Sequence, residues 1–217
     1  MLRKSMLAVA GALLLSSGFA INPANATLFT ITSVSFTVGS GYGDQSETPP
    51  ASATLLDVEF DTSGFVAQSF TLTNALDSQA FLFGTVELEE TDAGGGIQAA
   101  ETDNLGVTAH FVFTSPTGST QDVIAVGTAV AGSVSDAAVD YTLVWTPTLV
   151  NFGTGGVFRI DLANLLFDDQ ELLNLNATVT LINPSQVNGA PEPATLSLLG
   201  LGLAALGIAA RKRKRAT

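Results

Sequence analysis

Side chains capable of acid, base or nucleophilic chemistry are few in this sequence. The chain has one histidine, His110, and no cysteine. Between residues 27 and 190 it has no lysine, and Arg159 is the only basic residue. Thiol, Schiff-base and Ser-Lys mechanisms therefore lack an essential group, and a Ser-His-Asp mechanism would depend on His110 alone. Because no Gly-x-Ser-x-Gly motif accompanies this histidine, we expect it to be a locally hydrogen-bonded residue on a strand surface.

Carboxylates are the abundant ionisable groups. Of the 20 Asp and Glu residues, all but Glu192 lie between residues 27 and 190. A glycosidase needs only a pair of carboxylates, but the sequence singles out no pair and no pocket that would raise a catalytic pKa. We therefore predict that the chain is not an enzyme. The excess of negative charge repels phosphate backbones, so no nucleic-acid partner is expected.

Acidic turns offer the ligands that calcium prefers. Calcium takes about six to eight oxygen ligands from carboxylates and carbonyls. No turn here has the ligand spacing of an EF-hand. Two interpretations stay open, bound calcium or a solvated acidic surface that keeps the protein soluble, and no other cofactor is expected. The residues that could bind calcium fall in two segments: Glu101, Asp103 and Asn104, and Asp168, Asp169 and Glu171.

Short strands must position these residues. Apolar stretches rich in Val, Thr and Phe recur at intervals of about 8 to 12 residues, which favours a sandwich or barrel. The sequence predicts an all-β fold, an antiparallel β-sandwich of jelly-roll or immunoglobulin-like type with about eight or nine strands. Asn164–Leu173 does not alternate and stays open, with one or two helical turns as the alternative. The candidate strands are residues 29–38, 54–60, 65–72, 80–88, 107–113, 123–130, 139–145, 157–162 and 175–182.

Alternation within these strands predicts which side chains are buried. In the segment 56–61, Leu, Val and Phe alternate with acids, so one face enters the core and the other carries a carboxylate row. The odd positions of 107–113 and of 139–145 form further core faces, with Trp145 as an anchor. Tyr42 and Phe152 are the loop aromatics, which we expect to be half-buried.

The N-terminus has the organisation of a secretory signal peptide. Arg3 and Lys4 precede an apolar segment at residues 6–15, and Ala24 and Ala26 form a small-x-small cleavage site before Thr27. The alternative, an N-terminal membrane anchor, would need an apolar segment of about 20 residues, roughly twice the length present. We predict that residues 1–26 are removed.

The C-terminus contains three consecutive parts. Pro191, Glu192 and Pro193 keep the backbone extended, as a processing enzyme requires in its cleft. Residues 194–210 are apolar and would span about 25 Å as a helix, slightly less than a hydrocarbon core of about 30 Å. By the positive-inside rule, the basic residues that close the chain stay in the cytoplasm, which places the residues before the apolar segment on the other side of the membrane. The basic residues that close the chain are Arg211, Lys212, Arg213, Lys214 and Arg215.

These three parts resemble the PEP-CTERM sorting signal of Gram-negative, exopolysaccharide-producing bacteria. The resemblance implies export by the secretion machinery, transient membrane insertion through residues 194–210, and cleavage near Pro191–Pro193 by an exosortase, a membrane-embedded transpeptidase. It also implies delivery to the cell surface or the extracellular matrix. The alternative is an ordinary C-terminal membrane anchor. The expected organisation is a signal peptide (1–26), a β-sandwich (27–183), a linker (184–190) and a sorting segment (191–217).

The sequence leaves three hypotheses for the function of the central domain. Our leading hypothesis is a non-enzymatic surface or exopolysaccharide-matrix protein with a structural or adhesive role. A carbohydrate-binding module is the second, and it would need exposed aromatic side chains along a groove. A glycoside-active enzyme is the third, and it would need two carboxylates in a concave pocket.

Overall fold

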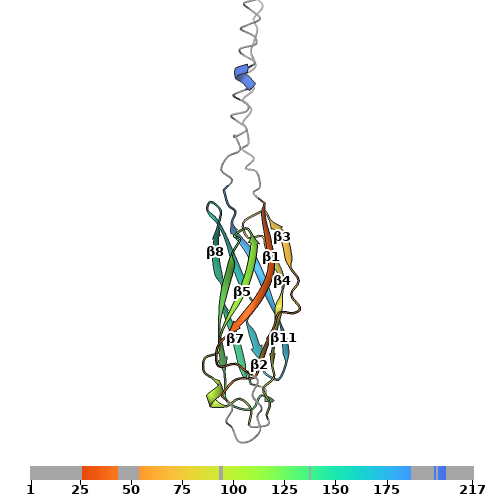
Figure 1. Ribbon diagram of the computed structural model, residues 1–217, viewed down its shortest axis with the longest axis vertical. Coiled ribbons are helices and arrows are strands. Elements are labelled where there is room, and N and C mark those ends of the chain that lie inside the picture. Colours follow the sequence, from red (N-terminus) through yellow and green to blue (C-terminus); the bar gives the residue numbers. More distant parts are fainter. Residues whose placement is uncertain are drawn as a thin grey trace, which may run out of the picture. The chain divides into compact units, whose positions relative to one another are not determined.

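The protein is described by a computed structural model covering residues 26–43, 54–92, 95–136, 138–186, 198 and 200–203. Residues Ala24–Val187 form one compact unit. Its described part contains eleven strands and one short 3-10 helix, and the strands form two antiparallel sheets (Figure 1). The predicted all-β sandwich is confirmed, with more strands than the sequence indicated.

The first sheet has six strands in the order β10-β7-β6-β5-β1-β3. The longest, β1, pairs with β5 on one side and β3 on the other, which places the first strand of the domain inside the sheet. The strands are β1 (Thr27–Val38), β3 (Gln68–Leu72), β5 (Gly106–Ser115), β6 (Thr120–Ala129), β7 (Tyr141–Thr146) and β10 (Leu165–Phe167).

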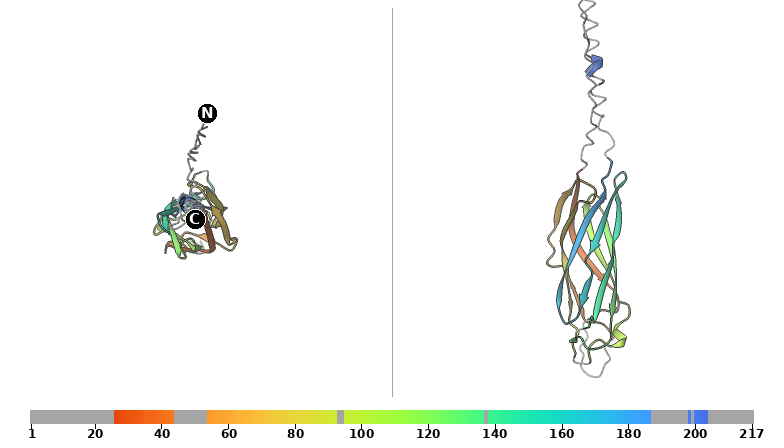
Figure 2. Two further views of the ribbon diagram at one scale, coloured as in Figure 1. Left: turned by 90° about the horizontal axis from the view of Figure 1, so that it is seen from above. Right: turned by 180° about the vertical axis from the view of Figure 1, so that it is seen from behind.

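The second sheet has five strands in the order β2-β4-β11-β9-β8. The last strand, β11, lies at its centre between β4 and β9. Figure 2 shows the sandwich from above and from behind. The strands are β2 (Val58–Asp61), β4 (Ser78–Leu88), β8 (Thr148–Phe152), β9 (Gly156–Leu162) and β11 (Leu172–Asn183).

Aromatic side chains join the two sheets. Phe83 of β4 packs against Phe111 of β5 with ring centroids 4.8 Å apart. Phe158 of β9 lies 5.3 Å from Phe113 of β5. The odd positions of β5 from Val107 to Phe113 are all buried, as the alternation predicted, because successive side chains of a strand point to opposite faces. Trp145 is a core residue with 5% exposure, as predicted.

Both aromatic residues that the sequence placed in loops belong to the core. Tyr42 and Phe152 are buried, so the expected half-buried position is wrong for both. The Tyr42 hydroxyl donates to the carbonyl of Leu105 (2.8 Å) and lies 2.6 Å from the hydroxyl of Tyr141. Burial raises the pKa of both phenols, so each stays neutral. A β-carbon at Gly127 would lie 2.4 Å from the Tyr42 hydroxyl, so this contact requires glycine.

Three further details differ from the sequence-based prediction. Residues 148–152 form the unpredicted strand β8. The open segment Asn164–Leu173 contains strand β10 and the first residues of β11, not helical turns. Val139 is exposed while Asp140 is buried, the reverse of the expected alternation, because β7 begins only at Tyr141.

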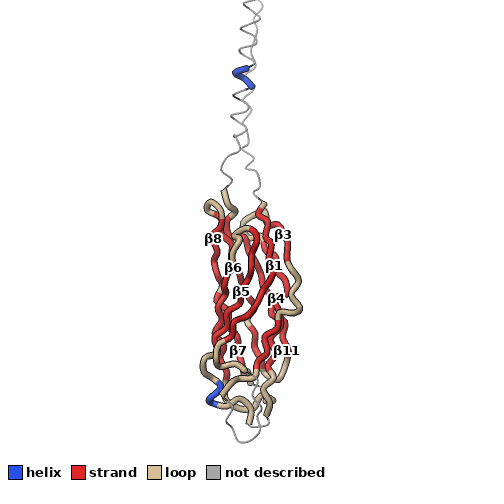
Figure 3. The backbone as a smooth tube through the Cα atoms, in the orientation of Figure 1, coloured by secondary structure: helices blue, strands red, loops and turns tan. Residues whose placement is uncertain are grey.

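The sandwich has two distinct ends. At one end β1 begins beside the end of β3, where Thr27 is paired with Leu72. The following turn contacts the end of β11, because the backbone N–H of Leu76 donates to the carbonyl of Leu181 (2.7 Å). The chain therefore enters and leaves the sandwich at the same end. The 3-10 helix and several loops gather at the opposite end (Figure 3).

Asp77 stabilises the turn between β3 and β4. Its Oδ2 atom accepts hydrogen bonds from the backbone N–H groups of Thr73 (3.0 Å) and Asn74 (2.7 Å). The hydrogen bond from Asn74, followed by that from Thr73, lowers the pKa of Asp77 below its ordinary value near 3.8. The ionised form is therefore favoured in the folded state.

This pKa shift predicts a pH-dependent loss of stability in an Asp77→Ala variant. A carboxylate whose pKa is lower in the folded than in the unfolded state stabilises the fold at pH values above its unfolded-state pKa. This stabilisation disappears as the pH falls through the folded-state pKa. The variant should therefore unfold at lower urea concentration than the wild-type chain at neutral pH, and the difference should shrink below about pH 4. Urea unfolding followed by intrinsic fluorescence at several pH values measures it. A difference that stays constant down to about pH 2 contradicts the assignment.

Candidate functional site

Three loops meet at the end of the sandwich opposite to the one where β1 begins and β11 ends: residues 89–105, 130–140 and 168–171. Backbone hydrogen bonds join them. The N–H of Gly132 donates to the carbonyl of Ile97, and the N–H of Asp140 donates to the carbonyl of Phe167, both at 2.9 Å. We call this region the acidic end, because its described carboxylates are Glu89, Glu90, Asp92, Glu101, Asp103, Asp136, Asp140, Asp168, Asp169 and Glu171.

Both segments predicted to bind calcium lie in the acidic end. Glu101 closes the 3-10 helix Ala99–Glu101, and its Oε2 atom accepts a hydrogen bond from the backbone N–H of Gln98 (2.6 Å). The next two predicted ligands, Asp103 and Asn104, are exposed.

In the other segment Asp168 and Asp169 are exposed, and the carbonyl of Glu171 accepts a hydrogen bond from the N–H of Leu88 (3.0 Å). Calcium binding by these residues stays a prediction.

Asp92 joins two loops of the acidic end. Its Oδ1 atom accepts hydrogen bonds from the hydroxyl of Ser133 (2.8 Å) and the backbone N–H of Val134 (2.9 Å). Its Oδ2 atom accepts one from the hydroxyl of Ser135. These bonds, that from Ser135 first, lower the pKa of Asp92. The carboxylate is thus ionised and connects the segment after β4 to the loop before β7.

The acidic end also contains buried acids. Among the described residues, the buried acidic side chains are Glu90, Glu101 and Asp140. Asp140 is 3% exposed, and its Oδ2 atom has no hydrogen-bond donor within the described part of the chain. Burial, and then the charges of other carboxylates, raise the pKa of Asp140. Sequence reasoning missed this residue because alternation placed it on the outer face of a strand.

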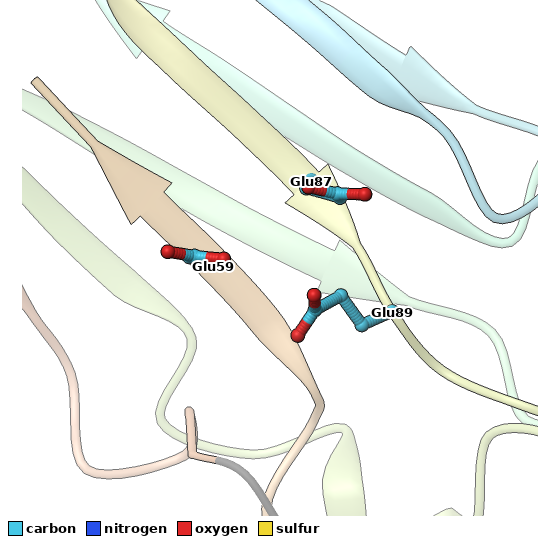
Figure 4. Close-up of side chains that lie close together, drawn as sticks. All are labelled: Glu59, Glu87 and Glu89. Carbon is cyan, nitrogen blue, oxygen red and sulfur yellow. The ribbon is translucent and has the colours of Figure 1, made fainter. Parts of the chain in front are cut away.

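A second group of carboxylates lies where β2 pairs with β4. Glu59 stands directly opposite Glu87, an arrangement of like charges that weakens a strand pair. One oxygen from each of Glu59, Glu87 and Glu89 lies within 4.8 Å of the other two (Figure 4). The sequence predicted a carboxylate row containing Glu59 but not this pairing, because strand register cannot be read from one strand. The group is mostly solvent-exposed, and exposed carboxylates commonly occur without a cation.

His110 lies on the outer face of the six-stranded sheet. Its Nδ1 atom is 2.7 Å from Oδ1 of Asp122, and its Nε2 atom is 2.8 Å from the Thr37 hydroxyl. The order hydroxyl, imidazole, carboxylate matches a hydrolytic triad. These contacts join neighbouring strands of one sheet, because Asp122 of β6 stands directly opposite His110, and Thr37 lies on β1, which pairs with the other side of β5. The predicted local hydrogen bonding of His110 is confirmed.

A groove lies at the end where the chain leaves the sandwich. It is formed by the turn between β5 and β6 and the turn between β8 and β9. None of its lining residues is an acid, so it lacks the carboxylate pair of a glycoside hydrolase. Its one aromatic residue, Phe152, is buried. The lining residues are Pro116, Thr117, Ser119, Gln121, Leu149, Val150, Asn151, Phe152 and Gly153.

The sorting signals fall largely outside the described residues. Strand β1 begins at Thr27, the residue predicted to become the first of the mature chain, and Ala26 before it is exposed, while Ala24 is outside the described part. Residues 191–193 and 211–215 are also outside it. Leu198 and residues 200–203 are helical. Within the residues that the structure describes, no helix is long and apolar enough to cross a membrane.

Comparison with known proteins identifies the C-terminal segment. Residues 190–214 match the PEP-CTERM protein-sorting motif, which overlaps the Pro-Glu-Pro, the apolar run and the basic cluster singled out in the sequence. No curated protein matches the chain, and no solved structure matches it. The chain therefore carries the PEP-CTERM sorting motif, and it is an exported protein that is directed to the cell surface and processed at the membrane by an exosortase.

Proposed function

We propose that the β-sandwich is a non-enzymatic structural or adhesive module of the cell surface or exopolysaccharide matrix of a Gram-negative-type bacterium. The observation that carries this proposal is the PEP-CTERM motif that follows the sandwich in the chain. A sorting motif of this kind delivers whatever domain precedes it. The delivered domain here is a two-sheet sandwich with an aromatic core.

The arrangement of the sandwich supports a structural role. The chain enters and leaves at one end, so the acidic end is the part of the sandwich most distant from those connections. A rigid module attached at one end presents its opposite end to neighbouring polymers. Exopolysaccharide is the proposed partner, bound through hydroxyl groups to carboxylates or through cations shared with them.

The contacts of the ionisable side chains support a non-enzymatic role. His110 is occupied by cross-strand hydrogen bonds on an open sheet face. The carboxylates of Asp77 and Asp92 hold turns and loops together. The groove between Pro116 and Gly153 offers no acid or base for glycoside cleavage. No observation favours a carbohydrate-binding groove, because the two aromatic residues that the sequence placed in loops are buried.

A complementation experiment in the native host tests this function. In a strain that lacks the gene, we expect weaker cell adhesion. We also expect less total protein in the fraction that contains the washed cell surface and its polymer. The full chain should restore both, and a chain without residues 27–183 but with both sorting signals should restore neither. The His110→Ala variant should complement as well as the wild-type chain, because the histidine has no catalytic part. Failure of His110→Ala at wild-type protein levels, or full adhesion without the sandwich, contradicts the proposal.

A further inference from the structure

Asp140 is a buried carboxylate with no compensating positive charge. Its side chain is 3% exposed, and its buried Oδ2 atom has no donor among the described residues. Removing a carboxylate from water without a partner is strongly unfavourable, so buried acids in proteins are paired, protonated or bound to metal. Between residues 27 and 190 the only basic residue is Arg159. Arg159 is 2.8 Å from Asp161 on its own strand, β9.

The position of Asp140 is fixed by the backbone. Its N–H donates to the carbonyl of Phe167 (2.9 Å), the last residue of β10. Its own carbonyl accepts a hydrogen bond from the N–H of Val130 (2.8 Å). These two bonds hold the backbone of Asp140 at the place where β10 meets the loop before β7.

Further carboxylates surround this fixed position. Asp168 and Asp169 follow Phe167 directly, and Asp136 belongs to the same loop as Asp140. Asp92 is held to that loop through Val134 (2.9 Å). Burial, and next the charges of these four carboxylates, raise the pKa of the Asp140 carboxyl. The structure thus concentrates negative charge around a buried acceptor that nothing in the described part of the chain neutralises.

We propose that Asp140, Asp136 and Asp168 bind a calcium ion at the acidic end, with Asp92 and Asp169 adding negative charge around it. Hard divalent cations take carboxylate and carbonyl oxygens in irregular, flexible geometry, which suits ligands from loops. Oδ1 of Asp136 accepts a hydrogen bond from the backbone N–H of Ala138 (2.7 Å), and Asp168 is exposed, so both side chains would have to turn toward Asp140 to share a cation with it. Of the residues that the sequence predicted to bind calcium, this site uses Asp168 as a ligand and Asp169 only for its charge. It does not use Glu101, Asp103, Asn104 or Glu171.

The bound ion would connect two loops of the acidic end. The loop 130–140 and the segment 168–171 would share one cation, so calcium should stabilise the sandwich. A ligand that binds only the folded state raises its stability in proportion to the logarithm of the ligand concentration over Kd. The inference goes beyond the proposed surface role and does not depend on it.

Thermal unfolding of the processed protein from the native host tests the site. At free calcium about 100-fold above Kd, we expect Tm to rise by about 5 to 10 °C relative to EDTA. The Asp140→Asn variant should lose this rise. In EDTA its Tm should equal or exceed that of the wild-type protein, because a neutral amide replaces an uncompensated buried charge. Asp103→Asn is the matched control, since it removes the same charge from an exposed position in the acidic end and should keep the full response.

Titration calorimetry with calcium chloride provides a second readout. Asp168→Asn changes an exposed side chain and leaves the buried position intact, so it tests the site if Asp140→Asn folds poorly. We expect its Kd for calcium to rise by about tenfold, the change typical of losing one interaction of about 1.4 kcal/mol. A wild-type Tm that is equal in calcium and EDTA overturns the proposal. Equal losses of calcium response in Asp103→Asn and Asp140→Asn overturn it too, because they would indicate general charge screening.

Discussion

Replacing Pro191, Glu192 and Pro193 together with alanine should leave the exported chain unprocessed, with its basic tail still present up to Thr217. The three residues lie within the matched sorting motif, and a proline favours an extended backbone in the residue before it, the conformation that we expect a processing cleft to bind. Alanine favours helix over an extended backbone, so we expect the variant to bind the processing cleft poorly. We expect nearly all of the variant to remain in the membrane fraction.

The matched control for this variant is Pro184→Ala. Pro184 directly follows β11 and lies outside the matched motif. This single change removes a proline close to the sandwich but keeps the sorting segment intact, so processing should be unaffected. Intact mass spectrometry of membrane and surface fractions compares the chains. If the triple variant has the same mature mass as the wild-type chain, the motif does not direct the cleavage.

Truncation of Phe158 should cause a large loss of stability, because this ring packs at the centre of the contact between the sheets. Phe158 is fully buried, and its ring centroid lies 5.2 Å from that of Phe29 and 5.3 Å from that of Phe113. Phe158 belongs to one sheet and its two partners to the other, so the ring contributes to holding the sheets together. Phe158→Ala should lower the free energy of unfolding by about 3 to 5 kcal/mol, from lost burial and the cavity left behind.

Leu149→Ala is the control for the Phe158 variant. Leu149 of β8 stands opposite Arg159, the residue that follows Phe158 in β9. Leu149 is 64% exposed. Its truncation should change the free energy of unfolding by less than about 0.5 kcal/mol. Urea unfolding at neutral pH measures both variants. Similar midpoints for Phe158→Ala and Leu149→Ala would show that the sheets are not held together as the structure indicates.

Much of the fold could be predicted from local alternation. The burial of β5 follows a strict two-residue period, as does the buried position of Trp145 in β7. Alternation failed where apolar side chains lie on the outer face. In β10, Leu166 is 61% exposed between two buried neighbours, so the segment read as a continuous apolar run. Strand β8 was missed because it is short and lies between Pro147 and a glycine-rich turn.

The acidic end could be predicted only in part. Acidic turns are visible in the sequence, and the structure places both predicted segments in loops at one end of the sandwich. The burial of Asp140 is a tertiary property, since it depends on the contact of its backbone with Phe167 of β10. The closeness of Glu59 to Glu87 depends on strand register. Neither the burial of Asp140 nor the closeness of Glu59 to Glu87 can be predicted from the local sequence.

The intact mass of the protein recovered from its native host tests export and sorting most directly. We predict a chain that begins at Thr27 and ends close to Pro191, with or without an added group. Such a mass would show that both terminal signals are removed and that the sandwich is delivered without them. A chain that still ends at Thr217 would contradict processing at the sorting motif and indicate an ordinary membrane-anchored domain.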